Sequence, residues 1–599
     1  MPTETETKIQ YLLIEDTESL KKIIPEIEIA KTIGIDTEGT SLDPYQGKLL
    51  LLQIATEDKS WVIDCLKVDL EVLKPVLEAD RPLKIVQNAK HDYKLLKVQA
   101  GITLGSIFDT MLAERLITCG ISREISLKTL AEKYLGLNLD KEVRKSFIEF
   151  YTPGRKLVYS EEQLRYAAQD AEILLPIFKK QFAQLRIDDL VETAKLEFNL
   201  VPVVSEMEIR GSLLDQKRWR AHTQELKKIR DTINTDMQND LRHLTTYAKV
   251  DLFGNVVDSI NLDSPLQLLE AFKKLGVEIP NTSEATLQKV DHPLAKKLLE
   301  YRGYEKMITA FGESILDKVN PVTGRLHPDF MQLGADTGRF ACNNPNLQQI
   351  PAESEFRSCF IASPGYKMIT ADYSQIELRI MAEVSEDPAF LEAFNSDVDL
   401  HTLTASQMFR IPVEEVSKER RFQAKSINFG LMYGRGPASL GMQIGLSVDE
   451  SRKLLDVYFK TYRRVKKWLD DIGRLAVKQG YIRTLGGRKR IFQLPDRDHP
   501  DYDKLIASID RQGKNTPIQG TSADITKYAL IYIARELKKR NLDAFLIHTV
   551  HDEIVSEARE DIADSVAKVV EEQMIEAGKK LLKLVPVKVD VHVADIWTK

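Results

Sequence analysis

The sequence has few cysteines, no long apolar run and no excess of positive charge. Its 599 residues include only four cysteines, which are far apart and form no Cys-x-x-Cys pair. This spacing argues against a zinc site and against a disulfide framework. No apolar run approaches the roughly 20 residues that a membrane-spanning helix needs, so we expect no membrane segment. The start, MPTETETKIQYLL, lacks the features of a secretory or organelle-import signal, and we expect a cytoplasmic location.

Length and charge limit the organisation of the chain. A single hydrophobic core stops growing near roughly 250–300 residues, so 599 residues require two or more domains. The formal net charge is -6, but binding to phosphates depends on where positive charge lies rather than on its total. Basic residues cluster at residues 217–230 and 483–490. For either cluster alone, a solvated surface is the simpler explanation.

The first 190 or so residues have the pattern of an α/β domain. Three short apolar runs, KTIGID, KLLLLQIAT and SWVID, predict strands of a sheet. Helical periodicity follows in IVQNAKHDYKLL and in SEEQLRYAAQDAEILLPIFKKQF. Residues 197–316 are mostly amphipathic helix, with loop-like segments at DLFGNVVDSINLDSP and EIPNTSEAT. The remainder mixes strand candidates, YKMITAD and AFLIHTV, with helices such as RRFQAKSINFGLMYG.

Four acidic residues and one tyrosine of the first domain are candidates for metal-assisted hydrolysis. Asp36 and Glu38 are two residues apart on a predicted strand, so both side chains point to one face. Tyr166 and Asp170 share a helix face, and Asp92 lies on another helix. Two hard cations can activate a water and neutralise the leaving oxygen of a phosphodiester, and oxygen ligands suit Mg²⁺ or Mn²⁺. We expect the four carboxylates to bind metal and the Tyr166 hydroxyl to orient the attacking water.

The order of these residues is more specific than any of them alone, since a single acidic residue is usually a solvated surface group. The chain has D-x-E on what we predict to be its first strand, N-x-x-x-D on a helix and Y-x-x-x-D on a later helix. This order resembles the DEDDy family of 3′-to-5′ exonucleases. The resemblance implies an RNase H-like fold for the first domain.

A second pair of carboxylates lies in the C-terminal part. Asp372 closes the predicted strand of KMITADYSQIELRI just before a helix, and Asp552 lies in VHDEIV between two strand-like runs. A strand end and a hairpin tip can meet. Such a pair would hold two metal ions between a primer 3′-hydroxyl and a nucleoside triphosphate. An aspartate in a turn is otherwise only a turn former.

One helix carries a stripe of two cations and two rings. Arg421, Lys425, Phe429 and Tyr433 recur every four residues, so they follow one face with a rise of about 6 Å per step. Cations followed by rings match the phosphates, sugar and base of a nucleoside triphosphate. The alternative is that both rings are core residues and both cations are solvated.

The segments DYSQIELRIMA, RRFQAKSINFGLMYG and VHDEIV resemble the three polymerase motifs of DNA polymerase family A. TGRFACNNPNLQQIP and TPIQGTSADITK resemble its flanking motifs. The resemblance implies a multidomain chain of α/β and α+β parts, in which an exonuclease domain at residues 1–195 precedes a right-hand polymerase domain at 196–599. It places the thumb at about 200–325, the palm at about 326–385 and 510–599, and the fingers at about 386–509. Because the chain begins with the exonuclease, we expect no 5′ nuclease domain.

The resemblance also assigns roles to individual residues. It implies metal binding by Asp372, Tyr373 and Asp552, with Glu553 as an adjacent acid of uncertain need. Lys425 is a candidate general acid for pyrophosphate, and Glu377 would crowd a ribose 2′-hydroxyl. Contacts to the incoming nucleotide are implied for Arg421, Lys425, Phe429, Tyr433, Glu377, Gln375 and His401. Contacts to the minor groove or primer end, which check the shape of the base pair, are implied for Arg339, Arg511, Asn515, Gln519 and His551.

The implied cofactor is Mg²⁺, which Mn²⁺ would replace, with two ions in each active site. The implied partners are primer-template DNA and deoxynucleoside triphosphates, and we expect a monomer at the nucleoid, or in a host cell or organelle if the chain is viral or processed. Thr549, Phe340 to Cys342, and Gly513 with Lys514 depart from the common family pattern. Two other functions stay open: a reverse transcriptase on the same scaffold, and a 3′-to-5′ nuclease whose C-terminal half only grips DNA.

Overall fold

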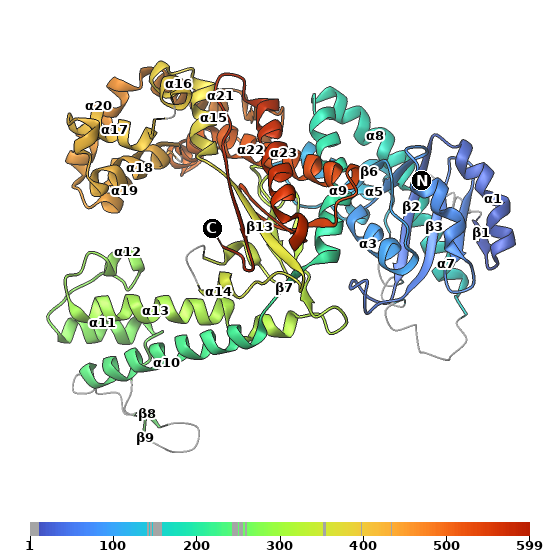
Figure 1. The fold of residues 1–599 in the computed structure, drawn as a ribbon, viewed down its shortest axis with the longest axis horizontal. Helices are drawn as coiled ribbons and strands as arrows, with labels where there is room; N and C mark the ends of the chain where they lie inside the picture. The colour runs from blue at the N-terminus through green and yellow to red at the C-terminus, as the bar shows by residue number, and fades with distance from the viewer. Residues whose placement is uncertain are drawn as a thin grey trace.

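The computed structural model describes residues 11–139, 143, 147, 158–241, 249–250, 256–257, 260–351, 355–396, 398–432 and 434–598. In Figure 1 an α/β unit that contains the N-terminal strand lies at one end, and a central sheet around β13 lies beside it. Two groups of helices, α10 to α13 and α16 to α21, extend on the other side of that sheet, one below the other in this view. No helix in the described ranges is long and apolar enough to cross a bilayer.

The N-terminal unit is built on a six-stranded mixed sheet in the order β1-β4-β3-β2-β5-β6. Its strands are β1 Tyr11–Ile14, β2 Thr32–Gly39, β3 Leu49–Ala55, β4 Ser60–Asp64, β5 Leu83–Val86 and β6 Ile107–Asp109. β3 and β4 are buried at every position, which explains their continuous apolar sequences. The three predicted strands are β2, β3 and β4. The prediction that D-x-E lies on the first strand is wrong, because β1 precedes it.

Helices surround this sheet. They are α1 Thr17–Ile29, α2 Lys74–Leu77, α3 Ala89–Ala100, α4 Thr110–Ile117, α5 Leu127–Leu135, α7 Glu161–Glu172, α8 Leu174–Ile187 and α9 Val191–Arg210. The helix predicted in IVQNAKHDYKLL is shorter than expected, because Ile85 and Val86 end β5. α7 begins at a capping box formed by Ser160 and Gln163. The Asp109 carboxylate accepts hydrogen bonds from backbone N–H groups at the starts of both α3 and α4.

The central sheet is antiparallel and four-stranded, in the order β16-β17-β13-β18. Its strands are β13 Tyr366–Tyr373, β16 Ala544–Val550, β17 Glu553–Arg559 and β18 Val589–Ala594. The predicted strands YKMITAD and AFLIHTV are β13 and β16. Two helices, α22 Tyr502–Lys539 and α23 Ala563–Leu581, pack against each other, and α23 packs on β13 and β18. The sheet therefore has a rigid helical backing.

Most of the remaining helices form the two groups seen in Figure 1. The first contains α10 Gln216–Leu241, α11 Pro265–Lys274, α12 Glu284–Leu287 and α13 Pro293–Phe311, with a hydrophobic core of its own. The second contains α16 Pro388–Asn395, α17 Leu400–Phe409, α18 Lys418–Met432, α19 Pro437–Ile444, α20 Val448–Thr461 and α21 Arg463–Gln479. α15 Ile376–Ser385 follows β13 directly. The loop-like segment at 251–265 contains β9 Val256–Val257, which pairs with β8 Lys249–Val250.

Short elements connect these parts. They are β7 Ser212–Leu213, β10 Arg325–Leu326, β11 Asp329–Met331, β12 Ala341–Asn343, α14 Glu355–Ser358, β14 Tyr481–Arg483 and β15 Lys489–Ile491.

In the first basic cluster, three cations on α10 are paired with acids: Arg218 with Glu355, Lys227 with Glu313, and Arg230 with Glu305.

The second basic cluster is an internal junction and not a solvated surface. Arg488 is buried and donates hydrogen bonds to Asp524 (2.8 Å) on α22 and to Glu197 on α9. Lys527, also on α22, donates to the same Glu197 carboxylate at 2.5 Å. Lys489 forms an ion pair with Asp188 at 2.7 Å. These contacts join the β14–β15 hairpin, α22 and the N-terminal unit.

Candidate active sites

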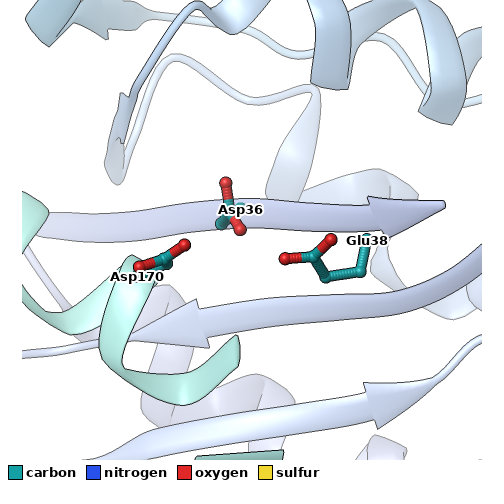
Figure 2. A group of neighbouring side chains, drawn as sticks. All are labelled: Asp36, Glu38 and Asp170. Atoms are coloured by element: carbon teal, nitrogen blue, oxygen red, sulfur yellow. The ribbon is translucent and has the colours of Figure 1, made fainter. Parts of the chain in front are cut away.

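Three carboxylates meet on the sheet of the N-terminal unit. One oxygen each from Asp36, Glu38 and Asp170 lies within 4.8 Å of the others. Figure 2 shows that the first two come from β2 and the third from α7. Glu38 and Asp170 are 7% and 6% exposed, and Asp36 is half-buried. Buried oxygen donors of this kind suit a hard divalent cation, so the donor set fits the predicted metal.

A glycine brings the helix close enough to complete this group. A Cβ atom on Gly34 would lie 2.1 Å from the backbone oxygen of Ala171, far inside contact distance. Only glycine therefore lets α7 approach β2 here. Asp170 directly precedes Ala171, so this contact sets its distance to Asp36. Sequence analysis did not single out Gly34, although a glycine in a buried strand indicates close backbone approach.

The Tyr166 hydroxyl faces the same carboxylates. Tyr166 lies one helical turn before Asp170 on α7. Burial, and then the charges of Asp170 and Glu38, raise the pKa of this phenol far above its usual value. The hydroxyl therefore remains protonated at neutral pH, and it forms a hydrogen bond with Asp170.

Asp92 has a different environment. Its carboxyl group accepts a hydrogen bond from the Thr37 hydroxyl at 2.6 Å, and burial raises its pKa to about 7. Thr37 lies between Asp36 and Glu38 on β2, and side chains of adjacent strand residues point to opposite faces. Asp92 is not in the three-carboxylate group. Metal binding by Asp92 stays a prediction.

A cavity of about 810 Å³ lies between α3 and α4 of the N-terminal unit and the segment at 317–334. Lys90 and Lys94 on α3 line it, and both form ion pairs with Glu208, at 2.6 and 2.5 Å. Leu42, on the loop after β2, is 70% exposed at its edge. The cavity therefore combines internally paired cations with an exposed apolar side chain.

The strand end that carries Asp372 and the turn that carries Asp552 lie next to each other on the central sheet, as the sequence predicts. Asp372 lies opposite Glu553 in the antiparallel pairing of β13 with β17. Asp552 lies in the turn between β16 and β17, and its carbonyl accepts a hydrogen bond from the Tyr373 N–H at 3.4 Å. His551 holds this turn with a left-handed φ of 55°. The strand end and the hairpin tip are thus adjacent.

Two neighbours of this pair are held inside the fold. Tyr373 is buried, and its hydroxyl donates a hydrogen bond to the Met574 carbonyl on α23 at 2.7 Å. Burial, and then the charge of Asp552, raise the pKa of this phenol. The Glu553 carboxylate lies in the core, where Arg357 and Trp597 donate hydrogen bonds to it.

The predicted stripe on α18 faces outward. Arg421 and Lys425 are exposed, whereas Phe429 is half-buried and packs against the main hydrophobic core, so the alternative of core rings and solvated cations stays open. Tyr433 lies outside the described residues. Arg421 forms a two-point ion pair with Asp399, at 2.7 and 3.2 Å.

Asp399 also caps α17, the helix that carries His401. Burial acts to raise the pKa of Asp399, but hydrogen bonds from Arg421 and Thr402 outweigh it and lower the pKa to about 2. Burial lowers the pKa of His401 to about 4. Its Nδ1 lies 3.1 Å from the Asn428 amide on α18. α17 and α18 thus form one packed pair, with His401 neutral at pH 7.

Residues 223–599 match DNA polymerase family A, and residues 11–185 match a 3′-5′ exonuclease family. The chain belongs to DNA polymerase family A. It is 32% identical to DNA polymerase I of Pseudomonas aeruginosa, over 99% of this chain and 66% of that protein. It is also 32% identical to DNA polymerase I of Aquifex aeolicus, over 99% of this chain and all of that protein. The chain spans 63% of the Chloroflexus aurantiacus relative, at 30% identity.

A solved structure has the same fold. It is described as the POL domain of Pol1 from M. smegmatis in complex with DNA primer-template and dNTP. Its TM-score is 0.83 at 28% identity, covering 98% of this chain and 99% of that one. The predicted family, and the predicted order of an exonuclease domain before a family A polymerase domain, are confirmed.

Most of the other predicted site residues of the family A part lie on or next to α15 and on α22. Glu377, in the first turn of α15, is buried and forms an ion pair with Arg339. Gln375 precedes α15 with a left-handed φ of 54°. Arg511, Asn515 and Gln519 recur every four residues along α22, so they follow one helix face. The pairing of Glu377 with Arg339 was not predicted, since no local pattern connects them.

Proposed function

We propose that this chain synthesises DNA on a template, adding deoxynucleotides to a primer 3′-hydroxyl, and that it removes nucleotides from the 3′ end at a second site. The observation that carries the proposal is the meeting of Asp372 and Asp552 on the central sheet of a family A chain. The three carboxylates on the sheet of the N-terminal unit support the nuclease activity.

In the polymerase site, Asp372 and Asp552 would hold Mg²⁺, or Mn²⁺ in its place, with two ions in the site. When bound, such ions lower the pKa of the attacking hydroxyl and neutralise charge on the leaving pyrophosphate. Arg421 and Lys425 are exposed on one helix face and supply positive charge for the phosphates. We assign Lys425 as the proton donor to the pyrophosphate, and Phe429 as the surface for sugar and base.

The neutral His401 side chain would donate a hydrogen bond to a phosphate without adding charge. Gln375 and Tyr433 would border the nucleotide, and Glu377 would crowd a ribose 2′-hydroxyl. We place Arg339, Arg511, Asn515, Gln519 and His551 at the primer end and minor groove. Arg339 would then either leave Glu377 or contact Glu377 and the primer end together. This exchange would couple the shape of the primer end to the nucleotide site.

In the nuclease site, Asp36, Glu38 and Asp170 would hold the metal ions, with Asp92 as a fourth acid. The bound ions supply an activated water and charge neutralisation at the leaving oxygen. The protonated Tyr166 hydroxyl would orient that water, because it already forms a hydrogen bond with Asp170.

We assign residues 1–195 to the exonuclease domain and 196–599 to the polymerase domain. The separate core of α10 to α13 supports a thumb at about 200–325. The sheet around β13, with α22 and α23, supports a palm at about 326–385 and 510–599, and α16 to α21 support fingers at about 386–509. We propose that the protein acts as a monomer on primer-template DNA, in the cytoplasm at the nucleoid, or in a host cell or organelle.

The test is incubation of the protein and Mg²⁺ with a 5′-labelled primer on a DNA template, with and without deoxynucleotides. Asp552→Ala and Asp36→Ala are the matched variants. Loss of extension only in Asp552→Ala, and loss of shortening only in Asp36→Ala, would support two separate sites. If the wild-type protein shortens the primer but never extends it, the chain is instead a 3′-to-5′ nuclease whose C-terminal half only grips DNA. Extension on a primed RNA template would add reverse transcription.

A further inference from the structure

The turn that carries Asp552 is tied to the protein core through the next residue. Glu553 is the first residue of β17 and lies opposite Asp372 in the neighbouring strand. It is only 3% exposed. A buried carboxylate is costly unless its oxygens accept hydrogen bonds and its charge is balanced.

Both oxygens of this carboxylate have donors. The Trp597 indole N–H donates to Oε1 at 2.7 Å, and the Arg357 guanidinium donates to Oε2 at 2.9 Å. The guanidinium also lies over the Trp597 ring, 4.1 Å from its centre. Arg357 and Trp597 are 4% and 3% exposed. The three side chains therefore form a closed, charge-balanced cluster away from solvent.

The surroundings fix this cluster to several parts of the chain. The backbone N–H of Trp597 donates to the Phe360 carbonyl at 2.9 Å, and the rings of Phe360 and His548 pack against the indole, with centroids at 5.4 and 5.0 Å. On the other side of the turn, the Thr549 hydroxyl donates to the Glu553 carbonyl at 2.9 Å. Both the side chain and the backbone of Glu553 are thus held.

We propose that Glu553, Arg357 and Trp597 form an anchor that positions Asp552, and that Glu553 is a positioning residue rather than a metal ligand. The proposal rests on the proposed polymerase function. Glu553 is buried, and each of its oxygens already accepts a hydrogen bond, from Trp597 or from Arg357. Turning this carboxylate towards a metal beside Asp552 would weaken both hydrogen bonds and the charge balance of the buried Arg357. Arg357 and Trp597, far from Asp552 in the sequence, thereby become positioning residues of the polymerase site.

A double-mutant cycle tests the anchor in the full chain. Trp597→Phe keeps a ring under Arg357 but removes the N–H donor, and Glu553→Gln keeps the shape of the acceptor but removes its charge. If the two residues act as one unit, the double variant is no worse than the more damaged single variant. We expect each change to slow single-turnover primer extension by about tenfold or more, since about tenfold is the lower limit for the loss of one hydrogen bond to a charged group.

Three further measurements accompany the cycle, and the first of them separates an anchor from a metal ligand. Mn²⁺ binding to the protein with primer-template, followed by electron paramagnetic resonance, should change less than about twofold in both single variants and equally in each. The nuclease activity of the same preparations should be unchanged, which shows that the N-terminal unit is folded and that the loss of extension is specific to the polymerase part. The unfolding temperature should fall by similar amounts in both.

Specific results would overturn the anchor. A tenfold or greater loss of Mn²⁺ affinity in Glu553→Gln, without one in Trp597→Phe, would make Glu553 a ligand. Multiplicative effects in the double variant would show that the two residues act independently. Failure of the wild-type protein to extend a primer would refute the proposed function instead, and the unfolding temperatures would still report whether Glu553 and Trp597 are coupled.

Discussion

Replacing Gly34 by alanine should disable the nuclease site and leave primer extension intact. The added Cβ would lie 2.1 Å from the Ala171 carbonyl oxygen, whereas real Cβ contacts are almost never under 3.0 Å. The obstacle is backbone, so no side chain can rotate away. α7 must therefore retreat from β2 by about 1 Å, and Asp170 moves with it.

The size of the effect follows from this displacement. A misplacement of about 1 Å in a catalytic group costs on the order of 10²-fold in rate. Overpacking of this kind also destabilises a fold by about 1–3 kcal/mol. The stability loss stays within the N-terminal unit, while Asp372 and Asp552 lie on a different sheet.

The assay is shortening of a 5′-labelled single strand without deoxynucleotides, beside extension of a primed template. Gly303→Ala is the matched control, because a Cβ there meets no atom within 4 Å. We expect the Gly34→Ala protein to lose about 10²-fold in shortening and the control to lose nothing. A Gly34→Ala protein that shortens the strand within twofold of wild type would refute the reasoning. So would equal losses of both activities.

Three further predictions follow from buried or paired charges. Asp399→Asn keeps the α17 cap but releases Arg421, so the KM for deoxynucleotides should fall about two- to fivefold, the worth of a half-exposed ion pair. Burial lowers the pKa of His548 to about 3, against about 6.5 unfolded. The stability that the neutral His548 allows is fully present above pH 6.5 and is lost as pH falls towards 3. Between pH 7 and 5 the unfolding temperature of the His548→Phe protein should therefore fall less than that of the wild-type protein. Arg488→Met should destabilise the chain by about 3–5 kcal/mol in urea unfolding, because it leaves Glu197 with one fewer buried partner.

Each of these has a contrary result. A higher KM in Asp399→Asn would mean that Asp399 holds Arg421 ready for the nucleotide instead of competing with it. An unchanged pH slope in His548→Phe would show that the imidazole is not kept neutral by burial. Arg488→Met with wild-type stability would mean that the junction contributes no net stabilisation, in which case Arg488→Lys should also be neutral.

Local patterns in the sequence predicted which side chains of the candidate sites share a strand face or a helix face. Asp36 and Glu38 share a strand face because side chains alternate, and Asp170 and Tyr166 share a helix face because of the helical repeat. Asp372 and Asp552 were predicted to meet because one ends a strand and the other lies in a turn, and the pairing of β13 with β17 brings them together. These arguments need only the period of one element and the chemistry of one turn.

Contacts between distant segments were not predicted. The basic residues at 483–490 were predicted to lie on a solvated surface. Arg488 is instead buried between α9 and α22, where Glu197 and Asp524 balance its charge. Thr549 departs from the family pattern, and its hydroxyl donates a hydrogen bond to the Glu553 carbonyl, a contact that the sequence does not indicate. Gly513 likewise faces Ala476 on α21, where a Cβ would lie 2.4 Å away. Each depends on a partner that sequence periodicity does not identify.

The net charge of -6 is compatible with the proposed binding of nucleic acid, because the cations predicted to contact the substrate are held in ion pairs. Arg421 is paired with Asp399, and Arg339 with Glu377. A phosphate that takes over the Arg421 Nε and Nη2 donors displaces Asp399, which costs about 0.2–1 kcal/mol for a partly exposed pair. A charge-assisted bond to phosphate is stronger than this cost. Replacing Asp399 by phosphate on Arg421 therefore favours a correctly placed triphosphate. An anion that only approaches α18 gains little, because Asp399 remains paired with Arg421.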